Sequence, residues 1–178
     1  MMPDHASIPA GNPETPALAP AIRLRVASYN IHGGVGCDGH FVPNRIVDVL
    51  REIDADIVAL QEVESRNTGF DMLEFLADAL SMHAIPGPTL LSATGDYGNG
   101  LLTRLPALNT RRIDLSIAHR EARGAIDAEL AFADQLAPDN RGATALRVIA
   151  THLGLHPTER RAQVRQLLDR YQFDVVQL

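Results

Sequence analysis

Apolar and polar residues recur along the chain in patterns that predict strands and helices in a definite order. Residues 22–29 alternate at first, which predicts a strand with one wetter face. Pro43 stands where a helix can begin, and apolar residues at helical spacing continue that helix to about Ile53. A short β-branched run, residues 57–60, comes next and predicts a second strand. Strand, helix and strand in this order predict a crossover unit that makes the two strands neighbours.

The second half of the chain changes from helical to β-rich patterning. Residues 70–80 carry an apolar stripe typical of a helix that packs on the core. Beyond Pro86-Gly87-Pro88 the pattern is β-rich. Four strands are predicted there, at Asn99–Arg104, Leu108–Leu115, Gly124–Phe132 and Ala145–Leu153. A last helix runs from Pro157 to about Tyr171, and the final residues resemble the start of another strand.

Composition limits the class of protein. The 178 residues, 46% of them hydrophobic, predict one domain over residues 22–178. Residues 1–21 are rich in proline and small residues without amphipathic period, so we expect a disordered leader. The single cysteine, Cys37, excludes an internal disulfide framework and a cysteine-rich zinc site. Because no run approaches the ~18 apolar residues of a membrane span, and no signal peptide is recognisable, we expect a soluble cytoplasmic protein.

Two short polar segments stand at the ends of the first two predicted strands. Asn30 follows the first strand and Glu62 follows the second. Oxygen ligands on rigid neighbouring strands can share a hard cation such as Mg²⁺, with water and substrate oxygens completing its shell. Asn30 could instead close a turn, and Glu62 could be an ordinary rim carboxylate in a salt bridge. The residues alone leave both alternatives open.

Five segments, taken together and in order, resemble the endonuclease/exonuclease/phosphatase superfamily, which includes deoxyribonuclease I-like enzymes. They are residues 26–31, residues 56–63, residues 97–106, residues 121–125, and residues 151–155 followed by Arg160 and Gln163. The resemblance implies an α/β (α+β) fold with a two-sheet β-sandwich flanked by helices. It also implies hydrolysis of a phosphoester with Mg²⁺, or Mn²⁺ in its place, through in-line attack by water. The substrate would be a small phosphodiester, a lipid headgroup or a nucleic acid, and the formal charge of −6 favours the first two.

The resemblance also implies roles for individual residues. Glu62 and Asn30 would hold the metal, and Asn30 would share in catalysis. His152 would donate a hydrogen bond to the phosphoryl oxygen, although a histidine at a strand end can equally be structural. Arg123 would bind phosphate or pair with Glu121, and Asn99 would contact the substrate.

Part of the family pattern is absent from this chain. The family completes its site with a Gly-Asp-x-Asn segment after the last helix and an Asp-His pair near its end, and this sequence has neither at those places. We therefore expect a fold incomplete at the C-terminus, comprising the N-terminal two-thirds of the family domain. A truncated or non-catalytic homologue that serves as a scaffold or binding module is the alternative function. Unpaired sheet edges predict marginal stability or self-association, which a monomeric, cooperative melt would contradict.

Overall fold

The computed structural model describes residues 23–66, 69–92, 95–131 and 145–171. The predicted leader 1–21 and the predicted strand after Tyr171 lie outside these residues. The elements are β1 (Val26–Asn30), η1 (His32–Gly34), α1 (Pro43–Ile53), β2 (Ile57–Arg66), β3 (Phe70–Asp71), α2 (Met72–Leu80), β4 (His83–Ser92), β5 (Gly95–Thr103), β6 (Ala107–Asp114), β7 (Gly124–Ala131), β8 (Ala145–Thr151) and α3 (Pro157–Tyr171).

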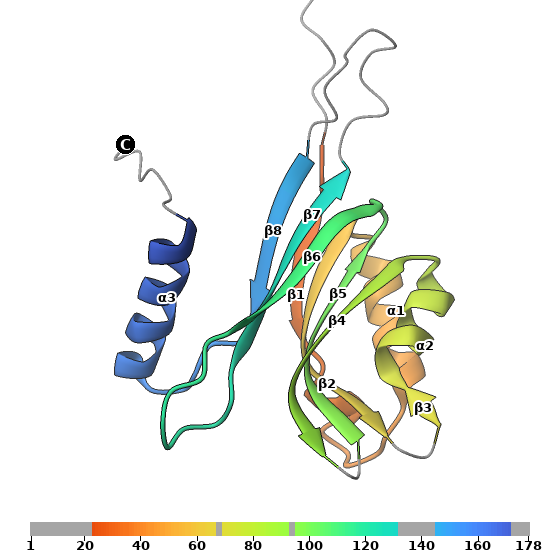
Figure 1. Cartoon of the computed structure of the whole chain (residues 1–178). Coiled ribbons are helices and arrows are strands. Elements are labelled where there is room, and N and C mark those ends of the chain that lie inside the picture. The colour runs from red at the N-terminus through yellow and green to blue at the C-terminus, as the bar shows by residue number, and fades with distance from the viewer. Residues whose placement is uncertain (1–22, 67–68, 93–94, 132–144, 172–178) are drawn as a thin grey trace, which may run out of the picture.

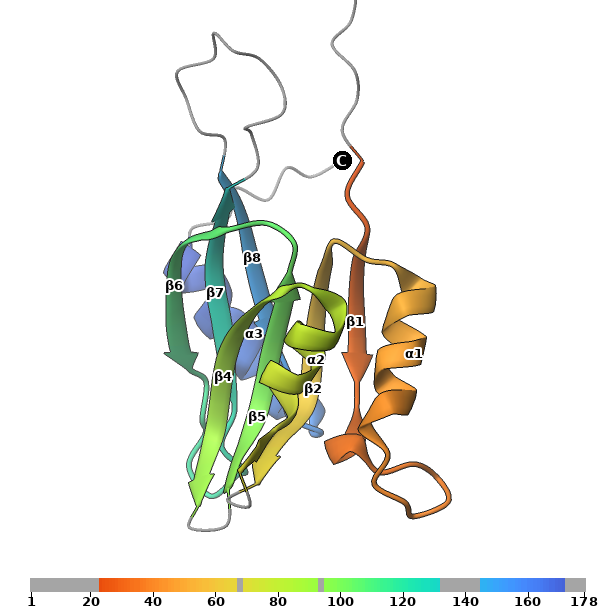
Figure 2. The same cartoon turned by 90° about the vertical axis from the view of Figure 1, so that its right-hand side faces the viewer.

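Two sheets pack face to face and helices cover their outer faces (Figure 1). The first sheet has the order β1-β2-β5-β4, with β3 paired to β2, and the second has the order β6-β7-β8. Helices α1 and α2 cover the outer face of the first sheet, as seen from their side in Figure 2, and α3 stands on the outer side of the second sheet. The predicted two-sheet sandwich flanked by helices is confirmed.

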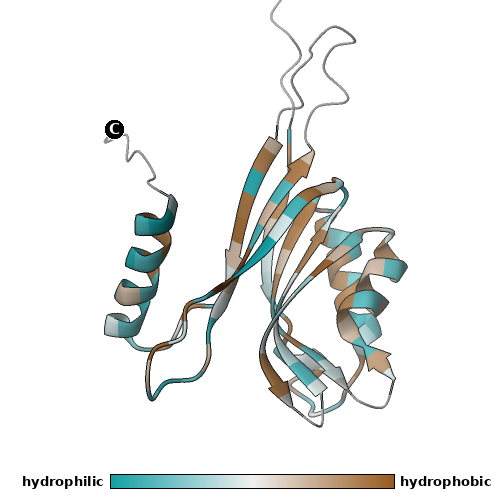
Figure 3. Ribbon diagram, viewed as in Figure 1, coloured by the Kyte–Doolittle hydropathy of each residue, from teal (hydrophilic) through white to brown (hydrophobic). Residues whose placement is uncertain are grey.

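Apolar side chains fill each of the three interfaces between these layers. The largest cluster joins α1 and α2 to the first sheet around Leu60, Leu76 and Leu102. A second joins the two sheets around Leu101 and Ile126. The third, smaller cluster lies where α3 meets the second sheet. Helix α3 is largely hydrophilic (Figure 3), so apolar burial holds it less strongly than it holds α1 and α2.

The crossover unit matches its prediction closely. Helix α1 spans Pro43–Ile53 as expected, and β1 pairs with β2 in parallel, with Asn30 opposite Gln61. Helix α2 begins at Met72 rather than Phe70, because Asp71 accepts hydrogen bonds from the Leu73 and Glu74 amides and caps the helix there. Phe70 belongs instead to the short strand β3.

The β-rich part of the chain begins earlier than predicted, because Pro86-Gly87-Pro88 lie inside β4. Proline cannot donate to a sheet ladder, so it is confined to edge strands and bulges. Strand β4 stands at an edge of the described part of the first sheet and pairs only with β5 there, with a register shift between Pro88 and Leu90. An edge strand needs donors on one side only, and this lets β4 contain two prolines.

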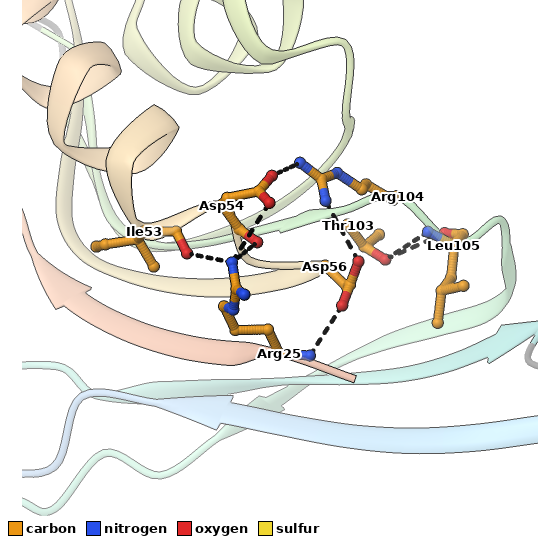
Figure 4. A network of polar contacts seen from close by, with 7 residues as sticks. All are labelled: Arg25, Ile53, Asp54, Asp56, Thr103, Arg104 and Leu105. Carbon is orange, nitrogen blue, oxygen red and sulfur yellow. Dashed lines mark hydrogen bonds and ion pairs between the residues drawn. The ribbon is translucent and has the colours of Figure 1, made fainter. Parts of the chain in front are cut away.

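A network of charged side chains fixes the end of the sandwich where β1 and β2 begin (Figure 4). Arg25 donates to the Ile53 and Asp54 carbonyls at the end of α1, while its own amide donates to Asp56. Arg104, just after β5, pairs with both Asp54 and Asp56. These contacts tie together the chain segments before β1, after α1 and after β5.

Two further predictions concern membrane-spanning segments and unpaired sheet edges. No helix among the described residues is both long and apolar enough to cross a membrane. In the same part of the chain β1 and β8 stand at sheet edges, and Val26 of β1 is 61% exposed. Self-association through such edges stays a prediction.

Candidate functional site

The strands that carry the candidate residues bring them to one end of the sandwich. Strands β1 and β8 end there, whereas β5 and β7 begin there. The chain therefore delivers side chains from both sheets to one place. Asn30 is the last residue of β1, Glu62 lies within β2, and His152 comes directly after β8.

Glu62 lies at a bulge in β2. The prediction that the strand ends here was wrong, because β2 continues to Arg66 past an irregularity between Leu60 and Val63. Glu62 has φ of 57°, a left-handed conformation that is costly for a residue with a Cβ. Bulges and strained residues cluster at functional sites because they re-aim a side chain out of the regular pleat. The bulge therefore sets the direction of the Glu62 carboxylate.

Asn30 holds this carboxylate. Its Nδ2 donates to Glu62 Oε1 at 2.8 Å, and its Oδ1 accepts the His32 amide at 3.0 Å. The amide is thus fixed at both ends. A carbonyl oxygen has two lone pairs, so Oδ1 keeps one acceptor position beyond the bond to His32.

His32 and Tyr97 also contact Glu62, and the sequence reasoning missed both. His32 Nδ1 lies 3.1 Å from Glu62 Oε2, and Tyr97 forms a side-chain hydrogen bond with Glu62. Burial would raise the pKa of Glu62, but hydrogen bonds from Asn30 and His32 hold it below its usual value. Burial and the charge of Glu62 raise the pKa of Tyr97 to about 12, so its hydroxyl stays protonated and can donate.

A usable sequence signal existed for each of these two residues. Tyr97 is two residues before Asn99, so both side chains point to the same face of a strand. His32 follows Asn30 by two residues and precedes two glycines, a pattern that favours a tight left-handed turn folding back on the Asn side chain.

Arg123 and His152 form the second half of the site. Arg123 is 6% exposed and makes a bidentate pair with Glu121, with both nitrogen–oxygen distances at 3.0 Å. Its Nε is buried and has no hydrogen-bond partner among the described residues. Burial lowers the pKa of His152, and the positive charge of Arg123 lowers it further. His152 is therefore a neutral imidazole at pH 7.

Asn99 connects the two sheets beneath this half of the site. It is 5% exposed, and its Nδ2 donates to the Gly124 carbonyl of β7 at 2.9 Å. Asn99 also lines a narrow crevice with Thr89, Tyr97, Gly98, Arg123 and His152. Gly98 is required there, because a Cβ would come within 2.6 Å of the Thr89 backbone nitrogen.

Helix α3 supports the loop that carries His152. Gln163 is fully buried, its Oε1 accepts the Gly154 amide at 2.8 Å, and its Nε2 donates to the Leu115 carbonyl. The carboxylate of Glu159 lies against Gly154, and a Cβ at Gly154 would have to displace it. The prediction that Gln163 serves packing more than chemistry agrees with these contacts.

The donors around Glu62 suit an open cation site rather than a closed one. No group of three or more His, Cys, Asp or Glu side chains in the described residues is arranged to hold a metal ion by itself. Mg²⁺, however, is commonly bound through one or two carboxylates, with water and substrate oxygens completing its shell. Glu62, with the free acceptor position of Asn30, meets that smaller requirement.

Comparisons with known proteins identify relatives of this chain. A sequence profile described as the endonuclease/exonuclease/phosphatase family matches residues 27–174. The uncharacterized protein YbhP of Escherichia coli (strain K12) is 29% identical over 157 residues, which cover 82% of this chain and 59% of that protein. The chain therefore spans less than two thirds of this relative.

Solved structures with the same fold include an endonuclease/exonuclease/phosphatase from Beutenbergia cavernae. It has a TM-score of 0.66 and 24% identity, over 82% of this chain and 43% of that one. A humanized TDP2 from D. rerio has a TM-score of 0.60 and 20% identity, over 85% and 57% of the two chains. ANGEL2, described as a 2′,3′-cyclic phosphatase, has a TM-score of 0.60 and 19% identity, over 84% and 47%.

Proposed function

Because this chain belongs to the endonuclease/exonuclease/phosphatase family, a family of phosphoester hydrolases that generally use a divalent metal, we propose that it is a metal-dependent phosphoester hydrolase. One observation supports this above the others. Asn30, Glu62 and His152, from three different strands, meet at one end of the sandwich, with Glu62 held in a strained conformation toward them. Strain of this kind costs about 1–3 kcal/mol and is concentrated at functional sites.

Glu62 and Asn30 would bind the cation, whereas other residues of the site would bind the phosphate. Glu62 presents its carboxylate to the cation, and Asn30 fixes the direction of that carboxylate while offering its amide oxygen. A bound Mg²⁺ or Mn²⁺ would polarise the phosphoryl group and stabilise its negative charge. Water attacks phosphorus in line with the leaving oxygen, with no covalent intermediate on the protein.

His152 and Arg123 act on the phosphoryl oxygens. A neutral imidazole donates one N–H, and His152 can direct that donor to an oxygen on which charge develops. The buried Arg123 Nε–H is an unsatisfied donor, which is costly unless an acceptor reaches it. A phosphate oxygen that reached this N–H would satisfy it. The crevice that Arg123 and Asn99 line is too narrow to hold a phosphate as it stands, so its side chains would have to move apart.

The net charge guides the choice of substrate. A formal charge of −6 gives no general attraction for a polyanion, so a small phosphodiester or a lipid headgroup is favoured over a long nucleic acid. A cytoplasmic location remains a prediction from composition.

The first test is hydrolysis of bis-p-nitrophenyl phosphate with Mg²⁺ or Mn²⁺ by the wild-type chain, Glu62→Ala and Glu52→Ala. Glu52 is an exposed carboxylate on α1 and serves as the matched control. We expect wild-type and Glu52→Ala turnover to agree, and Glu62→Ala to lose about 100-fold or more. Equal activity in all three proteins would refute the assignment of Glu62.

A non-catalytic scaffold or binding module is the competing function. A folded chain that binds Mn²⁺ through Glu62 yet hydrolyses nothing would support this alternative.

A further inference from the structure

His32 is held against the proposed cation ligand although its side chain is 79% exposed. An exposed His–Glu pair is by itself worth little, and such side chains usually move freely. Here the backbone of His32 is fixed, because its amide donates to Asn30 Oδ1 and its φ is 49°. Gly33 and Gly34 continue the turn at φ of 59° and 79°.

Packing keeps this turn in place. Gly34 is buried, and a Cβ there would come within 2.5 Å of the Met72 side chain of α2. The turn is therefore pressed against the core, and its first residue, His32, has its imidazole beside Glu62. Two non-glycine residues with left-handed backbone, His32 and Glu62, thus meet through their side chains. The left-handed backbone at both partners fixes the direction in which each side chain leaves the chain.

The distances around Glu62 fit a shared cation. Two donor atoms that each lie about 2.1 Å from a metal, at right angles, are about 3 Å apart. His32 Nδ1 and Glu62 Oε2 are 3.1 Å apart, which matches this spacing. Asn30 contacts the other carboxylate oxygen through its Nδ2, which donates a hydrogen bond, so Asn30 would bind a cation through the remaining lone pair of Oδ1. A cation bound here would replace the hydrogen bond between His32 Nδ1 and Glu62 Oε2 and take both atoms as ligands, with the His32 proton on Nε2.

We propose that His32 is a third ligand of the cation held by Glu62 and Asn30, so that the site has a mixed nitrogen and oxygen donor set. This inference rests on the proposed function, since it assumes a cation at Glu62. An imidazole donor favours transition metals over Mg²⁺, which prefers oxygen ligands throughout. The site should therefore select Mn²⁺ over Mg²⁺.

The test is pulsed EPR of Mn²⁺ bound to the intact chain, because this method detects an imidazole nitrogen coordinated to the metal independently of any turnover. Four proteins are compared: wild type, His32→Asp, His40→Asp and Glu62→Gln. Aspartate tolerates left-handed backbone and supplies an oxygen donor, so His32→Asp should fold and keep the cation. His40 is an exposed histidine in the loop before α1 and controls for the change in charge.

We expect imidazole coupling in wild type and His40→Asp, and its loss in His32→Asp. The ratio of Mn²⁺ to Mg²⁺ affinity should fall about tenfold in His32→Asp alone. Mn²⁺ bound through Glu62 without imidazole coupling, or coupling that survives in His32→Asp, would overturn the role of His32 and leave the proposed function standing. Absence of Mn²⁺ binding, or binding unchanged in Glu62→Gln, would overturn both.

Discussion

At the scale of single residues, the conformation of Glu62 is the most informative feature of the molecule. Its φ of 57° places an ordinary L-residue in a region that glycine occupies without penalty. The bulge that creates this conformation also brings the carboxylate to Asn30, His32 and Tyr97. Backbone strain and side-chain position are therefore two aspects of one local arrangement.

This arrangement predicts that glycine destabilises the protein less than alanine does at position 62, the reverse of the usual order in a strand. Glu62→Gly and Glu62→Ala both lose the side-chain contacts, but only alanine must adopt a left-handed backbone with a Cβ. We expect Glu62→Gly to be more stable than Glu62→Ala by about 1 kcal/mol, measured by urea unfolding. At Glu64, where φ is not positive, the order should reverse because glycine loses more entropy in a strand. The same order at both positions would contradict the strain argument.

The protonation of His152 gives a second prediction at this scale. Burial and Arg123 both disfavour its charged form, so its pKa should lie below the usual 6.5. NMR titration of the ring protons should show this, and Arg123→Gln should move the pKa upward. The neutral form would then persist in wild type when the pH falls below 6.5. An unchanged His152 pKa in Arg123→Gln would show that Arg123 does not act on it.

At the scale of elements, α3 contributes to the site through polar contacts. Its buried residues are Glu159 and Gln163, and both lie beside Gly154 in the loop that follows His152. A mostly hydrophilic helix thus positions a site residue through the hydrogen bonds of one buried amide.

Replacement of that amide should loosen the loop. Gln163→Leu preserves volume but leaves the Gly154 amide and the Leu115 carbonyl without their partner. We expect a loss of about 1–3 kcal/mol in the free energy of unfolding, and faster hydrogen exchange at the Gly154 amide. Gln166→Leu, at an exposed position on the same helix, is the matched control and should change neither measurement. Unchanged exchange at Gly154 in Gln163→Leu would mean that other contacts hold the loop.

At the scale of the whole molecule, one buried carboxylate connects α3 with the second sheet. Asp127 of β7 alternates with inward-facing apolar residues, so it points toward α3. It accepts hydrogen bonds from Arg111 of β6, Arg147 of β8 and the Tyr171 hydroxyl of α3. Side chains from β6, β8 and α3 therefore all bind the one carboxylate on β7.

This carboxylate predicts how stability changes with pH. Burial alone would raise the pKa of Asp127, but hydrogen bonds from Arg147 and Tyr171 hold it below 3.8. A depressed pKa stabilises the fold above the unfolded value, and that stabilisation disappears as the pH falls through the folded value.

Asp127→Asn should therefore destabilise the protein by about 2 kcal/mol at neutral pH and progressively less below pH ~4. Thermal unfolding of both proteins between pH 3 and about 7 tests this. Glu129→Gln, which removes a more exposed partner of Arg147, should have a smaller effect. A difference between wild type and Asp127→Asn that does not depend on pH would argue against an ionised Asp127.

The sequence by itself determined the family, the order of elements and the neighbouring strands that carry Asn30 and Glu62. Helices Pro43–Ile53 and Pro157–Tyr171 could be predicted because periodicity and an initial proline are local signals. Strand β4 escaped prediction because two prolines are tolerated only at a sheet edge, and edge position depends on the assembled sheet.

Only the tertiary structure decided how the site is arranged. The bulge at Glu62, the imidazole of His32 beside it and the Tyr97 hydroxyl result from pairing between β2 and β5 and from a turn packed against α2. The coupling of Arg123 to His152 joins loops 29 residues apart in sequence. Residue types can be read along a chain, but the direction of a side chain and its charged neighbours depend on contacts between distant segments.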